Sequence, residues 1–214
     1  MTEDCVYNHI ERPNDYRLGS VGKPLPGLQT KITVEGEIRL KSKGNMKGYY
    51  KEPLLTSEAF DEEGYLKTGD MGEYDADGFL FITGRVKDQF KTNKGKYISP
   101  SPIEIKLMEN TDIEPVCVVG MGIPQPIALI NLSEAGKLKT HIQIKESLAA
   151  SLVSLNTSLE KFERLEKAVV IKENWTIEND LLTPSLKIKR NLVEKGLYPF
   201  YPKWFNDAEQ VVCE

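Results

Sequence analysis

Two residues of opposite charge stand where their side chains could bind a nucleotide. Asp70 follows a short strand and a turn at Gly69, and its ionised carboxylate could accept hydrogen bonds from both hydroxyls of a ribose. Arg85 carries a planar fork of donors that suits phosphate or ribose oxygens. Each has a simpler interpretation: a turn aspartate that bonds its own backbone, which the spacing alone favours, and a surface ion pair worth about 0–1 kcal/mol.

A basic stretch over residues 84–104 must position these groups. It holds five Lys and Arg residues in a chain whose formal net charge is -4. The apolar run 79–82 before it predicts a buried strand, and Ser101-Pro102-Ile103-Glu104 after it predicts a helix that starts with a capping box. Gly95 can adopt positive φ. The stretch suits an anionic ligand or a hinge, although a solvated basic loop explains it equally well.

Composition narrows the class of protein. The chain of 214 residues is 40% hydrophobic and 28% charged, as in ordinary globular domains. Its acidic balance argues against nucleic-acid binding, and it lacks an apolar run long enough to span a membrane, which leaves peripheral membrane contact open. The polar N-terminal residues do not resemble a signal peptide, and three dispersed cysteines indicate a reducing compartment, so we expect a cytoplasmic location.

The hydrophobic pattern changes near residue 84. Before it, alternating residues at 29–34 and 37–41 predict a hairpin, residues 53–60 a short helix, and residues 75–78 the turn of a second hairpin. After it, residues 115–120, 126–132 and 168–171 predict strands, and apolar residues at helical spacing over 142–164 predict one long helix or two short ones. The sequence therefore predicts an α+β protein with a β-rich part over 1–84 and a small α+β domain with a short central sheet over 85–214.

Several ordered motifs resemble those of the adenylate-forming (AMP-binding) enzymes. Tyr65-Leu66-Lys67-Thr68-Gly69-Asp70 and Gly84-Arg85-Val86-Lys87-Asp88 are similar to consecutive signatures of that superfamily. Met1-Thr2-Glu3, Gly36-Glu37-Ile38 and Gly44-x-x-x-Gly48-Tyr49-Tyr50-x-x-Pro53 agree with further ones, in the family's order. Residues 182–190 resemble the last motif in the form typical of long-chain fatty acid–CoA ligases.

The resemblance implies a role for seven residues. Thr2 would touch the adenylate phosphate and Glu3 would help to hold Mg²⁺. Asp70 would bind the ribose hydroxyls and Arg85 would contact ribose or phosphate oxygens. Lys87 would be the hinge between a large N-terminal lobe and a small mobile C-terminal domain. Gly95 would line the pantetheine passage of CoA, and Lys187 would stabilise charge while a fatty acid carboxylate attacks the α-phosphate of ATP.

Two departures from the family's pattern bear on these assignments. Lys67 stands where many members have Arg. Leu186 precedes the proposed catalytic lysine where many members have Gly, so Lys189 remains a rival to Lys187. We prefer Lys187, because it directly follows Leu186, which stands at the position where many members have Gly.

No Gly/Ser/Thr-rich phosphate loop and no acyl pocket can be identified in the sequence. We therefore expect the chain to work with an N-terminal lobe of the same polypeptide, as part of a ligase that uses ATP, Mg²⁺ and CoA, and to be inactive alone. Two alternatives remain: a ligase that loads a carrier protein, and a non-catalytic binding or regulatory module derived from this family.

Overall fold

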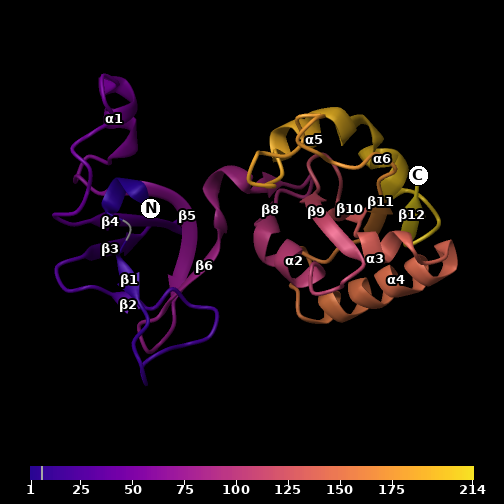
Figure 1. Ribbon diagram of the computed structural model, residues 1–214, viewed down its shortest axis with the longest axis horizontal. Helices are drawn as coiled ribbons and strands as arrows, with labels where there is room; N and C mark the ends of the chain where they lie inside the picture. Colours follow the sequence, from indigo (N-terminus) through magenta and orange to yellow (C-terminus); the bar gives the residue numbers. More distant parts are fainter. Residues whose placement is uncertain (6) are drawn as a thin grey trace. The chain divides into compact units, whose positions relative to one another are not determined.

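The computed structural model describes residues 1–5 and 7–214 (Figure 1). The chain divides into two compact units, Met1–Lys87 and Asp88–Glu214, which we call unit 1 and unit 2. Each has its own hydrophobic core.

Unit 1 is built on a four-stranded antiparallel sheet in the order β3-β4-β5-β6. The sheet strands are β3 (Gln29–Ile32), β4 (Glu37–Lys41), β5 (Leu66–Tyr74) and β6 (Leu80–Arg85). The remaining elements are the short helices η1 (Thr2–Asp4) and α1 (Pro53–Ala59) and the paired strands β1 (His9–Ile10) and β2 (Lys23–Pro24). Both predicted hairpins and the predicted short helix are present.

The core of unit 1 is small. Ile38 and Leu40 alternate along β4 toward the same face and pack with Leu80 of β6. The run 79–82 lies on β6 as expected, but Ile82 is 46% exposed, so the strand is not buried throughout. The strand expected to end at Lys67 instead continues to Tyr74 as β5, which places Asp70 inside the sheet and not on a turn after it.

Unit 2 contains a four-stranded sheet in the order β12-β11-β10-β9, in which β9 and β10 are antiparallel and the other pairs are parallel. Its strands are β9 (Ile113–Val119), β10 (Ile127–Leu132), β11 (Lys167–Val170) and β12 (Val211–Cys213). Its helices are α2 (Pro100–Leu107), α3 (Glu134–Lys137), α4 (His141–Thr157), α5 (Arg190–Leu197) and α6 (Tyr201–Phe205), with a 3-10 turn η3 (Tyr198–Phe200) between the last two. A small hairpin of β7 (Phe90–Lys91) and β8 (Tyr97–Ile98) precedes α2.

Helices cover both faces of this sheet (Figure 1). Ala128 and Ile130 of β10 pack on the side of α2 and α4, where α4 contributes Ile144, Leu148, Leu152 and Leu155. Ile127 and Leu129 face the other side, toward α5 and α6. Because β10 is buried on both faces, residues 127–130 are all apolar and show no alternation, and Asn131 is its one polar residue. The predicted α+β fold class is confirmed.

Two local expectations in unit 2 are corrected, and one strand is additional. Helix α2 starts at Pro100 with Ser99 as its N-cap, so residues 101–104 do not form a capping box. The genuine capping box lies at Thr140 and Gln143, which begin α4, and that helix ends at Thr157 and does not continue to residue 164. Strand β12 was not anticipated, because its three residues are too few for a recognisable pattern.

A buried lysine ties β12 to the rest of the sheet. The Lys167 residue is 7% exposed, and its ammonium donates to the carbonyl oxygens of Asp207 at 2.7 Å and Glu209 at 2.9 Å. A buried ammonium needs such partners, because desolvation without them costs several kcal/mol. The segment that leads into β12 is therefore held at the start of β11.

None of the helices formed by residues 1–5 and 7–214 has the length and hydrophobicity needed to cross a bilayer.

Gly136 and Gly196 test the packing of unit 2. A Cβ at Gly136 would lie 2.6 Å from the carbonyl oxygen of Asp112, whereas a Cβ at Gly196 in α5 would meet nothing within 4 Å. Gly136→Ala should therefore destabilise unit 2 by about 1–3 kcal/mol, and Gly196→Ala should stabilise it by about 0.5–1 kcal/mol. Urea denaturation followed by tryptophan fluorescence reports on this unit, since both tryptophans lie in it. Equal effects of the two substitutions would contradict the packing described.

Candidate functional site

Asp70 and Arg85 face each other across two strands. They are register partners in the antiparallel pair of β5 and β6, and Arg85 Nε lies 3.1 Å from Asp70 Oδ1. The Arg85 side chain is 65% exposed and the Asp70 side chain 32%. The structure therefore brings the two predicted nucleotide-binding residues together, as an exposed pair of the kind that contributes about 0–1 kcal/mol.

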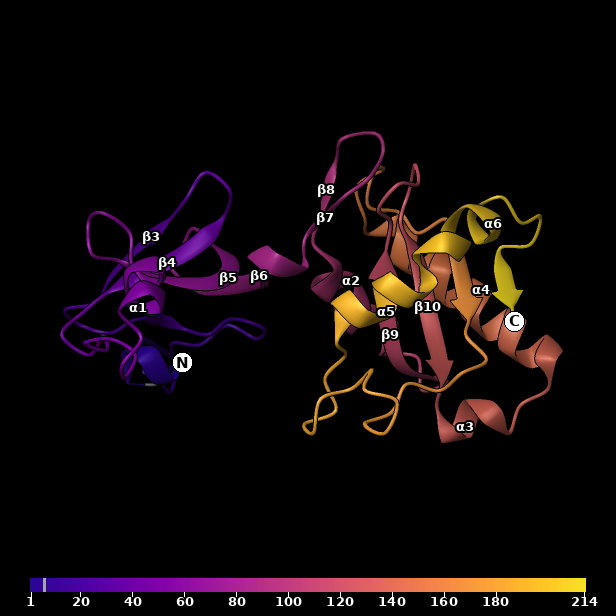
Figure 2. The same ribbon diagram turned by 90° about the horizontal axis from the view of Figure 1, so that it is seen from above.

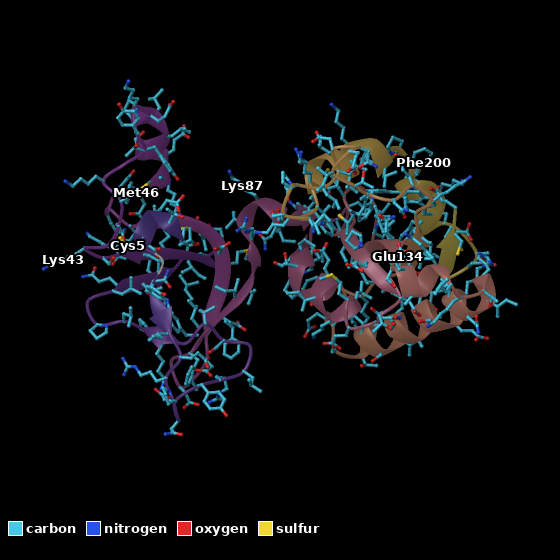
Figure 3. All side chains as sticks on the ribbon, viewed as in Figure 1. Cys5, Lys43, Met46, Lys87, Glu134 and Phe200 are labelled. Carbon is cyan, nitrogen blue, oxygen red and sulfur yellow. The ribbon has the colours of Figure 1, made fainter. Side chains whose placement is uncertain are left out.

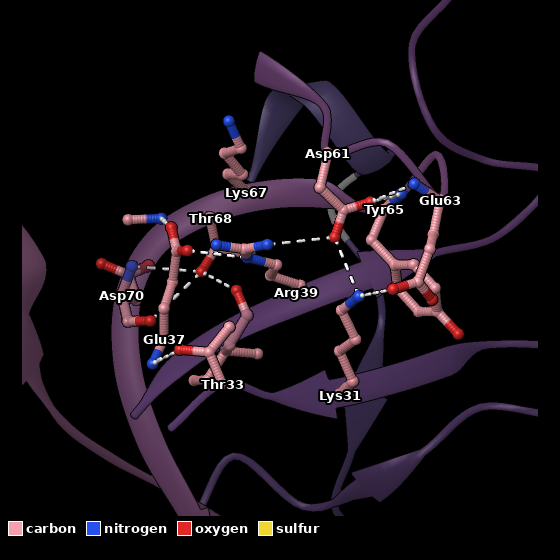
Figure 4. A network of polar contacts seen from close by, with 12 residues as sticks. Lys31, Thr33, Glu37, Arg39, Asp61, Glu63, Tyr65, Lys67, Thr68 and Asp70 are labelled. Atoms are coloured by element: carbon pink, nitrogen blue, oxygen red, sulfur yellow. Dashed lines mark hydrogen bonds and ion pairs between the residues drawn. The ribbon is translucent and has the colours of Figure 1, made fainter. Parts of the chain in front are cut away.

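Glu37 and Thr68 fix the backbone that carries Asp70 (Figure 4). The Glu37 carboxylate accepts a hydrogen bond from the Gly69 N–H at 3.3 Å, and the Thr68 hydroxyl oxygen accepts one from the Asp70 N–H at 3.1 Å. The same hydroxyl donates to the Ile38 carbonyl oxygen at 2.6 Å. Gly69 has φ of 71°, a conformation that glycine adopts without steric cost. These contacts hold the Asp70 carboxylate at a defined place on the sheet.

A chain of ion pairs extends from Glu37 along the sheet (Figure 4). Arg39 lies 2.8 Å from Glu37 and 3.1 Å from Asp61, and Lys31 lies 3.0 Å from Asp61. Burial acts to raise the pKa of Asp61, but the Tyr65 N–H and the two cations outweigh it and hold that pKa well below its ordinary value. Asp61 therefore stays ionised and keeps Arg39 beside Glu37.

A cavity of about 220 Å³ lies beside Asp70 within unit 1. Its lining is mostly apolar, and its polar members are Asn8, His9, Thr68 and Asp70. Met1 also lines it. Thr2 follows on η1 and is exposed, while Glu3 is half-buried and accepts a hydrogen bond from the Tyr49 hydroxyl at 3.2 Å. Thr2 and Glu3 thus stand next to a residue of the Asp70 cavity but are not part of its lining.

Lys87 and Gly95 occupy exposed turns. Lys87 is labelled in Figure 3 and lies in the 3-10 turn Val86–Asp88 that follows β6. Gly95 lies in the turn between β7 and β8 with φ of 78°, as its predicted freedom allows, and its N–H donates to the Thr92 carbonyl oxygen at 2.9 Å. A Cβ at Gly95 would meet only the Lys91 side chain.

Lys187 sits on a short hairpin of unit 2. Leu182 and Ile188 form a β-bridge, and the Thr183 N–H donates to the Lys187 carbonyl oxygen at 2.8 Å. The Leu186 N–H closes the turn on the Thr183 carbonyl oxygen at 2.8 Å, and the Lys187 N–H donates to the Thr183 hydroxyl oxygen at 3.0 Å. We call residues 182–188 the lysine hairpin.

Leu186 has φ of 60°, in the left-handed region that favours glycine. Glycine, which many members of the resembled family carry at this position, adopts such a conformation without strain, whereas leucine does not.

The two candidate lysines differ in what they contact. Lys189 caps α5, and its ammonium pairs with the Asp180 carboxylate. Lys187 is exposed, and within the part of the chain that the structure describes its ammonium has no hydrogen-bond or ion-pair partner. Lys187 is thus the lysine available to an anionic ligand.

The predicted site residues do not include Glu37, Thr68, Glu104 or Arg190. Glu37 and Thr68 fall inside the motifs that also contain or accompany Asp70, so their place in those motifs was the available signal. Glu104 was read as a capping residue, but it is a buried carboxylate 9% exposed that pairs with Arg190. A partner 86 residues away in sequence leaves no local pattern.

No group of three or more His, Cys, Asp and Glu side chains within residues 1–5 and 7–214 is arranged to hold a metal ion.

The comparisons with known proteins agree with the motifs. A family model described as the AMP-binding enzyme C-terminal domain matches residues 87–196. Long-chain-fatty-acid–CoA ligase FadD15 of Mycobacterium tuberculosis is 32% identical in an alignment that covers 86% of this chain and 33% of that protein. Long-chain-fatty-acid–CoA ligase 5 of Mus musculus is 32% identical in an alignment that covers 85% of this chain and 31% of that protein.

Solved structures share the fold. The adenylation domain of a carboxylate reductase from Mycobacterium chelonae matches with a TM-score of 0.72 at 21% identity, over 90% of this chain and 33% of that one. O-succinylbenzoate coenzyme A synthetase from Bacillus subtilis, in complex with AMP, matches with a TM-score of 0.68 at 25% identity, over 98% of this chain and 40% of that one.

The chain belongs to the AMP-binding enzyme family and contains its C-terminal domain. It spans about a third of the length of the curated relatives it matches. The predicted resemblance to adenylate-forming ligases is thereby confirmed.

His9 should make unit 1 sensitive to pH. Burial lowers the pKa of His9, against a smaller opposing effect of Asp4, and its ring contacts the Tyr74 hydroxyl at 2.8 Å. Below the ordinary pKa of about 6.5, the unfolded chain binds a proton that the folded chain does not, so the free energy of unfolding falls by at most about 1.4 kcal/mol per pH unit. We expect faster amide hydrogen exchange in β4 and β5 at pH 5.5 than at pH 7.5, corrected for intrinsic rates, and no such change in His9→Gln. A pH-independent unit 1 would contradict the burial of His9.

Leu186→Gly should stabilise unit 2. A left-handed backbone costs a non-glycine residue about 1–2 kcal/mol, which the substitution removes. Glycine also makes the unfolded chain more flexible, and this opposes the gain by about 0.5–1 kcal/mol. Leu138 is a matched control, because it is 90% exposed and has an ordinary helical φ of -80°. Leu138→Gly should destabilise unit 2 by about 1 kcal/mol in the same urea denaturation. The same sign for both substitutions would contradict the strain at Leu186.

Proposed function

We propose that this chain is the C-terminal part of an ATP-dependent long-chain fatty acid–CoA ligase. The observation that carries the proposal is the lysine hairpin: it presents Lys187 exposed and without a partner among the described residues, directly after the left-handed Leu186, while Lys189 is engaged by Asp180. The curated relatives are ligases of that name, which supports fatty acids and CoA as substrates.

In this proposal unit 1 binds the nucleoside. Asp70 accepts hydrogen bonds from the ribose hydroxyls, and Arg85 exchanges its ion pair with Asp70 for contacts to ribose or phosphate oxygens. Glu37 and Thr68 keep the Asp70 backbone in place during this exchange. Thr2, on the turn next to the Asp70 cavity, contacts the phosphate.

Mg²⁺ fits the carboxylates of unit 1 only as an ion shared with the nucleotide. Such an ion needs one or two protein carboxylates together with phosphate oxygens and water, and Glu3 offers one, half-buried beside Tyr49. When bound, Mg²⁺ would stabilise the negative charge of departing pyrophosphate.

Lys187 acts in the first step. An oxygen of the fatty acid carboxylate attacks the α-phosphorus of ATP, the acyl–AMP bond forms, and pyrophosphate leaves with its electron pair. Both reactants are anionic, so an ammonium at their meeting point stabilises the transition state. The preceding lobe of the same polypeptide would supply the phosphate loop and the acyl pocket.

The Gly95 turn acts in the second step, in which the thiolate of CoA attacks the acyl carbon and AMP leaves. Its exposed backbone, without a side chain, leaves room for the slender pantetheine. Lys87 is the proposed hinge that exchanges the lysine hairpin for the Gly95 turn, since a few residues are enough to absorb such a change in φ and ψ.

The matched pair Lys187→Ala and Lys189→Ala tests this assignment in a polypeptide that carries these residues together with the preceding lobe. Fatty-acid-dependent ATP–pyrophosphate exchange should fall about 10²–10³-fold in Lys187→Ala and only a few-fold in Lys189→Ala, because the second ammonium is held by Asp180. Thioester formation from supplied acyl-adenylate should survive both substitutions.

The chain of 214 residues alone provides a control and should give no exchange. Exchange by the chain alone, or equal losses in the two variants, would contradict the proposal.

A further inference from the structure

A buried ion pair joins α2 to the start of α5. The Arg190 guanidinium donates to a Glu104 carboxylate oxygen, to the Val118 carbonyl oxygen at 2.7 Å and to Cys117 Sγ at 3.2 Å. The side chains of Arg190 and Glu104 are 14% and 12% exposed. Burial raises the pKa of Glu104, while the guanidinium and the Val118 N–H act against that rise. Removing one partner of such a pair leaves a buried charge without its counter-charge and is strongly destabilising.

The pair completes the edge of the sheet. Val118 pairs with Ala128 of β10 on one side only, because β9 is the edge strand. On its outer side the Val118 N–H donates to the Glu104 carboxylate at 2.7 Å, and its carbonyl oxygen accepts from Arg190. Two side chains thus replace a neighbouring strand at this residue, where buried backbone groups without partners would destabilise the fold.

The same pair lies between the two loops assigned to the two reaction steps. Glu104 is on α2, which directly follows the β7–β8 hairpin with Gly95, and Arg190 comes three residues after Lys187. Figure 2 shows that hairpin at one end of unit 2 and the segment between β11 and α5, which includes the lysine hairpin, at the opposite end. The α2 and α5 helices lie between them in this view.

The attachment is rigid on both sides. Arg190 is the first residue of α5, and the residue before it, Lys189, donates its N–H to the Leu181 carbonyl oxygen at 2.9 Å at the base of the lysine hairpin. On the other side, Ile98 of β8 is fully buried, and Ser99 is the only residue between that strand and α2. Little slack separates either loop from the pair.

We infer that Glu104 and Arg190 are positioning residues that hold the lysine hairpin and the Gly95 hairpin in one fixed relation through Val118 of β9. The inference rests on the proposed function for the meaning of the two loops. Its consequence is specific: loosening this pair impairs both half-reactions, whereas loss of Lys187 impairs only the first.

Amide hydrogen exchange on the chain of 214 residues tests the mechanical part without any assay of activity. Arg190→Lys keeps the positive charge but loses the planar guanidinium, and a single ammonium cannot reach all three acceptors of Arg190. Amide hydrogen exchange at residues 118, 186 and 187 should therefore rise about tenfold or more. Exchange at Leu148 and Leu152, in the middle of α4, reports the opening of unit 2 as a whole and should rise at least threefold less than exchange at residues 118, 186 and 187. Equal acceleration throughout unit 2, or unchanged exchange at residues 186 and 187, would overturn the inference.

A second pair of variants keeps the test valid if Arg190→Lys does not fold. Glu104→Gln retains an oxygen that accepts from both Val118 and Arg190, and should stay within about threefold of the original exchange rates at residues 118, 186 and 187. Glu104→Ala removes that oxygen and should accelerate those amides about tenfold or more. Equal exchange rates in the two Glu104 variants would overturn the role of the carboxylate oxygen.

The kinetic readout uses the polypeptide with its preceding lobe. Arg190→Lys should lower kcat about tenfold both for pyrophosphate exchange and for thioester formation from supplied acyl-adenylate, with KM for ATP unchanged, because positioning is lost and nucleotide binding is not. A loss confined to one half-reaction would overturn the coupling. If the unsubstituted protein forms no acyl-adenylate, the proposed function fails. The amide hydrogen exchange measurements do not depend on activity and still test the positioning role of the pair.

Discussion

The double-sided burial of β10 is the constraint on which unit 2 depends. Ile127 and Leu129 face one side and Ala128 and Ile130 the other, so helices must cover both faces and strands must pair with both edges. Strand β11 pairs with one edge of β10 and β9 pairs with the other. The outer edge of β9 then carries the backbone groups that lack a neighbouring strand. The Glu104–Arg190 pair meets that need at Val118, so a demand of the core places an ion pair between the segments that carry Gly95 and Lys187.

In unit 1 the position of Asp70 is fixed mainly by polar contacts and not by a large apolar core. Its core is small, and the position of Asp70 depends on polar contacts: Glu37 and Thr68 hold the backbone, and Arg39 and Asp61 hold Glu37. A sheet with few apolar contacts can still fix one carboxylate when each neighbouring N–H has a committed acceptor. The exposed Arg85, in contrast, is held only weakly and can leave Asp70 for a better partner.

Much of this organisation could be predicted from the sequence, because it rests on local patterns. Alternation at 29–41 gave the first hairpin, the apolar run at 126–132 gave the central strand, and ordered motifs pointed to Asp70 and Lys187. What failed needed long-range information. Glu104 fits a capping pattern locally, yet its partners Arg190 and Val118 are supplied by the fold. Asp70 seemed to follow a strand, because a glycine normally ends one, whereas β5 continues through Gly69.

The contact of Lys167 with the segment before β12 defines how far the folded unit reaches. The family match ends at residue 196, but the acceptors of this buried ammonium are at positions 207 and 209, and β12 shields the edge of β11. A chain that ended at residue 196 would leave the Lys167 ammonium without its acceptors and would expose the edge of β11. Residues 197–214 thus belong to the folded unit, and shortened forms that lack them are expected to self-associate through the exposed edge of β11.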